Sequence, residues 1–177
     1  MESAREAVLR TFRWIDGHAD VWAVFRDAAA LRAVVAGLAA PCRVLGVTAV
    51  AGIESRGFLL GGAVAVELGV GFVPLRKAGS LFPGPTLGTR TELDYRGISG
   101  ELLVQRAALA GGDRVVLVDD WIETGSQAVA ARHLVEACGA SLVGISVVVD
   151  DLGGRGVRRS LPSVTSLVTP AELGPQT

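Results

Sequence analysis

Two adjacent acids, Asp119 and Asp120, directly follow four aliphatic residues in the stretch VVLVDDWIETGSQ, residues 115–127. A Thr-Gly-Ser turn begins five residues after the first of them, at Thr124. In parallel α/β sheets, ligands bind beyond the carboxyl ends of the strands. The first N–H groups of a helix have no partner within the helix and attract anions. The stretch therefore predicts carboxylates that suit a sugar diol or a hydrated Mg²⁺ ion, close to a turn that binds a phosphate.

A simpler interpretation of the same stretch is that the two acids begin a loop and that Thr124 caps a helix. Capping requires a single Ser, Thr, Asp or Asn side chain. It does not account for two acids after a buried strand, so the ligand site is the favoured interpretation.

The first half of the chain alternates apolar segments of helical and strand character. Asp27 is a candidate N-cap for the helix that follows it, and Gly69 a candidate end for a later helix. The patterns predict helices over 3–14, 28–39 and 57–68, with Asp16-Gly17 as a turn, and strands over 44–53 and 71–76.

The second half contains the clearest β-α-β pattern. A strand over 114–118 is followed by a helix over about 125–138 and a strand over 142–149, and residues 163–168 form a last strand. Residues 77–100 lack a helical period, and the segment 91–105 is a possible hairpin. The alternation predicts an α/β fold with a mostly parallel sheet, helices on both faces, and one domain over 1–177.

Composition narrows the classes of function. The net charge is −1 with 50% hydrophobic residues, and no basic patch or arm indicates a nucleic-acid partner. The uncharged stretch 57–66 is far shorter than the roughly 20 residues that span a membrane, and the first residues do not resemble a signal peptide. We expect a cytoplasmic protein. Cys42 and Cys138 are expected to be buried reduced thiols, and no metal is assigned to side chains alone.

The acid-rich stretch resembles the phosphoribosyl-pyrophosphate (PRPP) signature of type I phosphoribosyltransferases. Three further segments, 24–27 (VFRD), 51–77 and 83–86 (PGPT), resemble adenine phosphoribosyltransferases, in the same order and at similar spacing. Together they cover roughly residues 18–150. The resemblance implies a type I phosphoribosyltransferase fold, with a mostly parallel central sheet flanked by helices. It also implies a small hood from about 1–25 and the C-terminal segment, and a flexible lid loop over about 78–100.

The resemblance also implies roles for individual residues. Asp119 and Asp120 would hold the ribose hydroxyls of PRPP, and the 5-phosphate would be bound by Glu123, Thr124, Gly125, Ser126 and Gln127. The pyrophosphate would be bound by Ser55, Arg56, Arg76 and Lys77, and the base by Val24, Phe25 and Arg26. Asp94, Glu123 and Arg56 would be catalytic. Mg²⁺ would be the cofactor, held mainly through PRPP and water, in a homodimeric enzyme.

Several of these residues have structural alternatives. Arg76 and Lys77 also fit a solvated strand end, and Phe25 also fits the core. Arg26 is equally consistent with a residue that flanks a helix start. Asp94 lies in a segment where a plain surface charge is the ordinary expectation.

The phosphate turn departs from the Ala-Thr-Gly-Gly-Thr usual in the adenine enzymes, because this chain reads Glu123-Thr124-Gly125-Ser126-Gln127. A carboxylate at the first position resembles the hypoxanthine-guanine branch, where the acid faces the purine. The predicted function is purine phosphoribosyl transfer from PRPP in purine salvage, with adenine as the first choice of base. The alternatives are transfer to another purine or purine-like heterocycle, and a non-catalytic PRPP-binding or regulatory protein.

Overall fold

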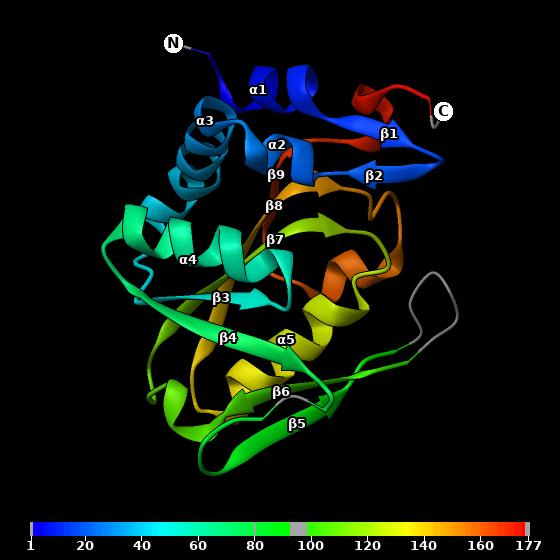
Figure 1. Ribbon diagram of the computed structural model, residues 1–177. Coiled ribbons are helices and arrows are strands. Elements are labelled where there is room, and N and C mark those ends of the chain that lie inside the picture. Colours follow the sequence, from blue (N-terminus) through cyan, green and yellow to red (C-terminus); the bar gives the residue numbers. More distant parts are fainter. Residues whose placement is uncertain (1, 80, 93–98, 176–177) are drawn as a thin grey trace.

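The computed structural model describes residues 2–79, 81–92 and 99–175, which build a seven-stranded sheet in the order β5-β6-β4-β3-β7-β8-β9 (Figure 1). Strands β4, β3, β7, β8 and β9 are parallel, whereas β6 is antiparallel to β4 and to β5. The predicted, mostly parallel sheet is confirmed. The strands are β3 (Ala49–Ile53), β4 (Gly71–Lys77), β5 (Thr86–Arg90), β6 (Glu101–Gln105), β7 (Arg114–Ile122), β8 (Ser141–Asp150) and β9 (Val164–Val168).

Helices cover both faces of the sheet. Helices α3 (Ala28–Ala39) and α4 (Arg56–Leu68) share a buried cluster with Val116 and Val118 of β7. Helix α5 (Ser126–Ala137) shares a second cluster with Val115 and Leu117 of the same strand. Successive side chains of a strand point to opposite faces, so the aliphatic run of β7 supplies both cores. That arrangement explains why the run shows no polar alternation.

A smaller layer lies above the sheet in Figure 1. It consists of α1 (Ala4–Thr11), the hairpin β1 (Arg13–Ile15) and β2 (His18–Asp20), and α2 (Trp22–Arg26). The C-terminal turn η4 (Pro170–Leu173) joins it through an ion pair of 2.8 Å between Arg5 Nε and Glu172 Oε1. The two segments predicted to form the hood therefore lie together.

Several predicted element ends are confirmed. Asp27 Oδ1 accepts a hydrogen bond of 2.8 Å from the Ala30 N–H, so α3 begins where the predicted cap placed it. Helix α4 ends at Gly69, whose φ of 71° is left-handed. The possible hairpin is also confirmed, although its first arm is β5, earlier in the chain than predicted.

Three predicted boundaries are wrong. The first helix ends at Thr11 rather than residue 14, because the chain turns into β1. The strand predicted from residue 44 begins at Ala49, because Pro41 starts a 3-10 turn, η1 (Ala40–Val44), and Gly46 adopts a φ of 59°. Strand β7 continues to Ile122, so the two acids lie within the strand, near its carboxyl end, rather than after it.

The remaining predictions concern the burial of the two cysteines and the absence of a membrane-spanning segment. Cys42 and Cys138 are both free thiols. Cys42 is buried, which raises the pKa of its thiol to about 11, but Cys138 is only partly buried, contrary to prediction. Within the described residues, no helix has the length and apolar character needed to cross a membrane.

Candidate active site

The acid pair at the end of β7 forms an ion pair with the first residue of α4. Asp120 has a side chain only 6% exposed, and its Oδ2 atom lies 2.9 Å from Arg56 Nε. No hydrogen bond of good geometry reaches that oxygen within the described part of the chain. Asp119 Oδ1 accepts a hydrogen bond of 2.9 Å from the Asp120 N–H. The pair is thus held by the strand and by one cation from the neighbouring helix.

Two glycines bring α4 close to these acids. A Cβ atom on Gly57 would lie 3.0 Å from Asp119 Oδ1, and one on Gly52 would lie 2.1 Å from the Gly57 carbonyl oxygen. Distances this short leave no room for a side chain at Gly52. The close approach places the start of α4 directly against the carboxylates. Neither glycine was among the predicted site residues, although both lie in the AGIESRG segment that carried the resemblance.

The environment of Asp119 disfavours its charged form. Burial is the main cause, and the negative charge of Asp120 is the second; together they raise the pKa of Asp119 well above its ordinary value. Arg56 acts in the opposite direction. A ligand that brings hydroxyl donors or a cation to this carboxylate would favour its ionised form.

Two helices begin side by side at this edge of the sheet. Strands β3 and β7 are adjacent and parallel, α4 follows β3, and α5 follows β7. Neither helix has a hydrogen bond from a side-chain cap. Among the described residues, the backbone N–H groups of 55–57 and of Thr124, Gly125 and Gln127 have no hydrogen-bond acceptor. Each helix start therefore offers unpartnered donors and a positive dipole end to an anion.

The turn before α5 is shaped by Gly125, whose φ of 78° is left-handed. Thr124 Oγ1 accepts a hydrogen bond of 3.3 Å from the Ser126 N–H and donates one of 3.0 Å to Ser126 Oγ. Ser126 itself is buried, with 5% exposed. The turn is consequently preorganised by its own hydroxyls. The 3.3 Å bond also accounts for the Ser126 N–H, which is not one of the free donors.

The basic residues at the end of β4 are engaged with Glu54, a residue that the sequence analysis did not select. Arg76 donates to Glu54 Oε1 at 3.4 Å, and the Lys77 N–H donates to Glu54 Oε2 at 3.2 Å. Arg76 also donates to the Leu81 carbonyl oxygen at 3.0 Å, and its guanidinium lies 5.7 Å from the ring centroid of Phe82. Arg76 thus links Glu54 to the segment that leaves β4.

Comparisons with known proteins show the family to which the chain belongs. The family model for the phosphoribosyl transferase domain matches residues 25–173. The chain belongs to the phosphoribosyltransferase family. It is 46% identical over 154 residues to the adenine phosphoribosyltransferase of Nocardioides sp., covering 84% of this chain and 82% of that one. It is 45% identical over 138 residues to the enzyme of the same name from Nitrosospira multiformis, covering 77% of each.

A solved phosphoribosyltransferase structure extends the likeness to the fold. The adenine phosphoribosyltransferase of Giardia lamblia, complexed with 9-deazaadenine, matches with a TM-score of 0.85 and 34% identity. The match covers 96% of this chain and 98% of that one. The similarity therefore includes the small layer as well as the central sheet.

The residues assigned to the base lie on α2 of this phosphoribosyltransferase, at the inner side of the small layer. Val24 is fully buried and Phe25 is 8% exposed, both in the same core cluster, whereas Arg26 is exposed. Phe25 lies edge-to-face with Trp22 at 5.7 Å, and Trp22 is 52% exposed. In this structure Val24 exposes no surface to a ligand, and most of the Phe25 ring is already covered.

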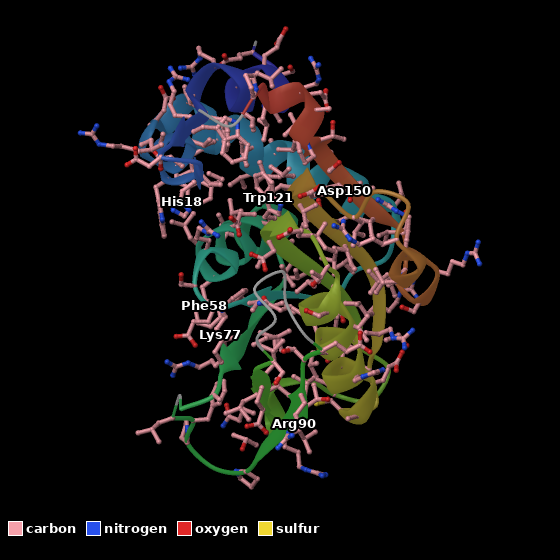
Figure 2. All side chains as sticks on the ribbon, turned by 90° about the vertical axis from the view of Figure 1, so that its right-hand side faces the viewer. His18, Phe58, Lys77, Arg90, Trp121 and Asp150 are labelled. Carbon is pink, nitrogen blue, oxygen red and sulfur yellow. The ribbon has the colours of Figure 1, made fainter. Side chains whose placement is uncertain are left out.

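Trp121, directly after the acid pair, connects the small layer to β7. Its ring lies 6.1 Å from that of Trp14, which in turn lies 5.2 Å from Phe12, both in edge-to-face arrangements. Figure 2 looks onto the edge at which the arrowheads of β3, β4 and β7 point in Figure 1. In that view Trp121 lies between His18 and Asp150, above the side chains of Phe58 and Lys77.

Two further residues, Asp94 and Glu123, were predicted to be catalytic. Asp94 lies outside the described residues. Glu123 is half-buried and follows β7 directly, on the α5 side of the acid pair. Among the described residues, no three His, Cys, Asp or Glu side chains form a group that could hold a metal ion.

Proposed function

We propose that this phosphoribosyltransferase transfers the 5-phosphoribosyl group from PRPP to adenine, giving AMP and pyrophosphate in purine salvage. The observation that carries the proposal is the pair of uncapped helix starts, at Arg56 and Ser126, on either side of Asp119 and Asp120. PRPP has the same order of groups, with a phosphate at one end, a ribose diol in the middle and a pyrophosphate at the other. The relatives named as adenine phosphoribosyltransferases support adenine as the base.

The ribose diol is held by Asp119 and Asp120. Both carboxylates accept hydrogen bonds from the 2- and 3-hydroxyls, and their negative charge favours the positive charge that develops at C1 of the ribose. The 5-phosphate lies in the turn of residues 123–127, where the N–H groups of Thr124, Gly125 and Gln127 donate to its oxygens.

The pyrophosphate is held at the start of α4, by the N–H groups of residues 55–57. Arg56 exchanges its contact with Asp120 for the pyrophosphate when PRPP binds, which frees the carboxylate for the ribose. Arg76 and Lys77 add positive charge from the end of β4. This cationic side stabilises the anion that leaves in the transition state.

The reaction exchanges one bond at C1. The C1–O bond to pyrophosphate breaks and the leaving group takes the electron pair. A ring nitrogen of adenine then donates its electron pair to C1, and its proton passes to a carboxylate, for which Asp94 and Glu123 are the candidates.

Mg²⁺ fits this site as an ion that binds together with PRPP rather than as an ion held by protein ligands alone. It takes oxygen ligands and commonly binds through one or two carboxylates, water and substrate phosphates. The adjacent Asp119 and Asp120 offer carboxylates of that kind, and Asp120 Oδ2 has no hydrogen bond within the described residues. When bound with PRPP, the ion neutralises charge on the pyrophosphate.

A homodimer is part of the proposal, supported by the outer face of α4. Leu59 and Val66 lie seven residues apart on that helix, and they are 39% and 83% exposed. Apolar side chains in this arrangement suit burial against a second copy.

A second candidate is transfer to another purine, and Glu123 is the residue that favours it. A carboxylate beside a bound phosphate is repulsive unless it is directed toward the base. In that position it can accept a hydrogen bond from a purine ring N–H, which is the arrangement that the sequence analysis related to the hypoxanthine-guanine branch. Adenine and the other purines are therefore to be compared under the same conditions.

The test is nucleotide formation from PRPP and Mg²⁺ with adenine, hypoxanthine and guanine in parallel, with products identified by mass. We expect AMP as the main product, and severely reduced AMP formation with Asp120→Asn, which leaves the fold intact. A faster reaction with hypoxanthine or guanine than with adenine would favour the second candidate, transfer to another purine. Binding of PRPP without turnover of any purine would identify a non-catalytic PRPP-binding protein.

A further inference from the structure

We propose that Arg155 is a positioning residue for the phosphate turn, and that it fixes the peptide between Glu123 and Thr124 so that its N–H faces the phosphate. The inference rests on the proposed function of that turn. It concerns the segment 150–160, which follows β8 and which neither the acid motif nor the other resembling segments include.

The segment packs directly against the phosphate turn. The Asp151 N–H donates to the Ile122 carbonyl oxygen at 2.8 Å, at the end of β7. An ideal Cβ atom on Gly125 would lie 3.0 Å from Val157 Cγ1 and 3.1 Å from Leu152 Cδ2. Leu152 is fully buried. The back of the turn is therefore in contact with apolar side chains of this segment.

Arg155 supplies the one charged contact from the segment to the backbone of the turn among the described residues. Its Nη1 group donates to the Glu123 carbonyl oxygen at 3.3 Å and also to the Asp151 carbonyl oxygen. One guanidinium thus joins the end of β7, through Glu123, to the start of the segment. A hydrogen bond from a charged donor is stronger than one between neutral groups.

The segment that carries Arg155 is itself held in place. Asp150, at the end of β8, accepts from Arg158 Nη2 at 2.6 Å and from the Leu152 N–H at 3.0 Å. The Arg155 N–H donates to the Leu152 carbonyl oxygen at 3.2 Å. These bonds fix the backbone from which the Arg155 side chain extends.

The planarity of the peptide bond converts this contact into an orientation. The Glu123–Thr124 peptide is not among the cis bonds of the described chain, so its C=O and N–H point in opposite directions. Holding the Glu123 carbonyl toward Arg155 therefore directs the Thr124 N–H away from the segment 150–160. That N–H has no acceptor within the described residues. It is one of the donors that the proposed function assigns to the 5-phosphate.

The chain offers a matched control in the same segment. Arg159 is exposed, and its side chain makes no hydrogen bond or ion pair with any part of the chain that the structure describes. Arg159→Met therefore removes the same charge as Arg155→Met without removing a contact to the turn. Any general electrostatic attraction for phosphates is lost in both variants.

The experiment measures binding of AMP and of Mg-pyrophosphate by calorimetry, together with KM and kcat for PRPP. We expect Arg155→Met to weaken AMP binding about tenfold and to raise KM for PRPP, with Mg-pyrophosphate binding unchanged. Arg159→Met should match the wild type in all four quantities. Arg155→Lys keeps the charge but not the planar fork, so it should give an intermediate loss and provides the test if Arg155→Met unfolds.

Equal AMP affinity in Arg155→Met, Arg155→Lys and Arg159→Met would overturn the positioning role. An equal loss for AMP and Mg-pyrophosphate would also overturn it, because it would indicate a general effect on folding. The failure of the proposed function is distinct, because it is seen in the wild-type protein itself, which then forms no AMP from PRPP and adenine.

Discussion

Gly125→Ala tests the most constrained backbone position in the phosphate turn. Two effects act on the substituted residue. Its φ of 78° is left-handed, which costs about 1–2 kcal/mol for a residue with a Cβ atom. The new methyl group also lies 3.0 Å from Val157 Cγ1 and 3.1 Å from Leu152 Cδ2, and overpacking of that kind costs about 1–3 kcal/mol. We expect the free energy of unfolding to fall by about 2–5 kcal/mol.

Gly153→Ala separates the two effects. Gly153 has a φ of 54°, and a Cβ atom there would have nothing within 4 Å. This variant should therefore lose only the conformational part, about 1–2 kcal/mol. The difference between Gly125→Ala and Gly153→Ala measures the contact with the segment 150–160.

The assay is urea unfolding followed by tryptophan fluorescence, with the slope of each transition compared to establish that only stability has changed. The double variant Gly125→Ala/Val157→Ala should lose about 1 kcal/mol less of the free energy of unfolding than the two single losses added together, because the side chain in contact is shortened. AMP affinity should fall in Gly125→Ala and remain unchanged in Gly153→Ala. Equal losses of stability in the two glycine variants, with no recovery on adding Val157→Ala, would refute the reasoning.

Three further predictions concern the acid pair and the helix packed against it. In the unliganded protein the raised pKa of Asp119 means that, as the pH rises above about 4, the unfolded chain releases a proton that the folded chain retains. The free energy of unfolding then falls by about 1.4 kcal/mol for each unit by which the folded pKa is raised. Asp119→Asn should thus be more stable than the wild type at pH 7 and equal to it near pH 3 in urea unfolding; a difference independent of pH would contradict this. Asp120→Asn should reduce kcat/KM for PRPP by at least about a hundredfold with its circular dichroism spectrum unchanged, because it removes a charge used in the transition state; near-normal turnover would show that the carboxylate is not used. Gly52→Ala should cost more than about 4 kcal/mol, because its methyl group would meet the Gly57 carbonyl at 2.1 Å, whereas Gly62→Ala, in open space on α4, should stabilise by about 0.5–1 kcal/mol; similar thermal midpoints would disprove the packing argument.

Local patterns were enough to predict much of the fold. The Asp27 cap, the end of α4 at Gly69 and the β-α-β unit around α5 follow from residue types and periods that act over a few neighbours. The hairpin β1–β2 was missed, because short strands carry little periodic signal. The wrong start of β3 has a different origin, since Val44 and Leu45 are apolar but lie in a turn formed by Pro41 and Gly46.

The candidate site was predicted in part. The motif selected the acid pair and the turn at Thr124, the resemblance added Arg56, and the structure brings these together at one edge of the sheet. The roles of these residues remain predictions, as does that of Asp94. Neither Glu54 nor Arg155 was among the predicted site residues. Their importance depends on contacts with residues 22 and 32 positions away along the chain, which no local pattern reveals.

By itself the sequence determined which groups the site contains: two carboxylates after an aliphatic strand, and glycines and hydroxyls before a helix. These features are local, because strand burial, caps and left-handed turns depend on the residues of one segment. Only the tertiary structure decided that α4 begins beside α5, that Arg56 pairs with Asp120, and that the segment 150–160 contacts the turn of residues 123–127. The physical reason is that strand order and close packing join segments that are distant in the chain.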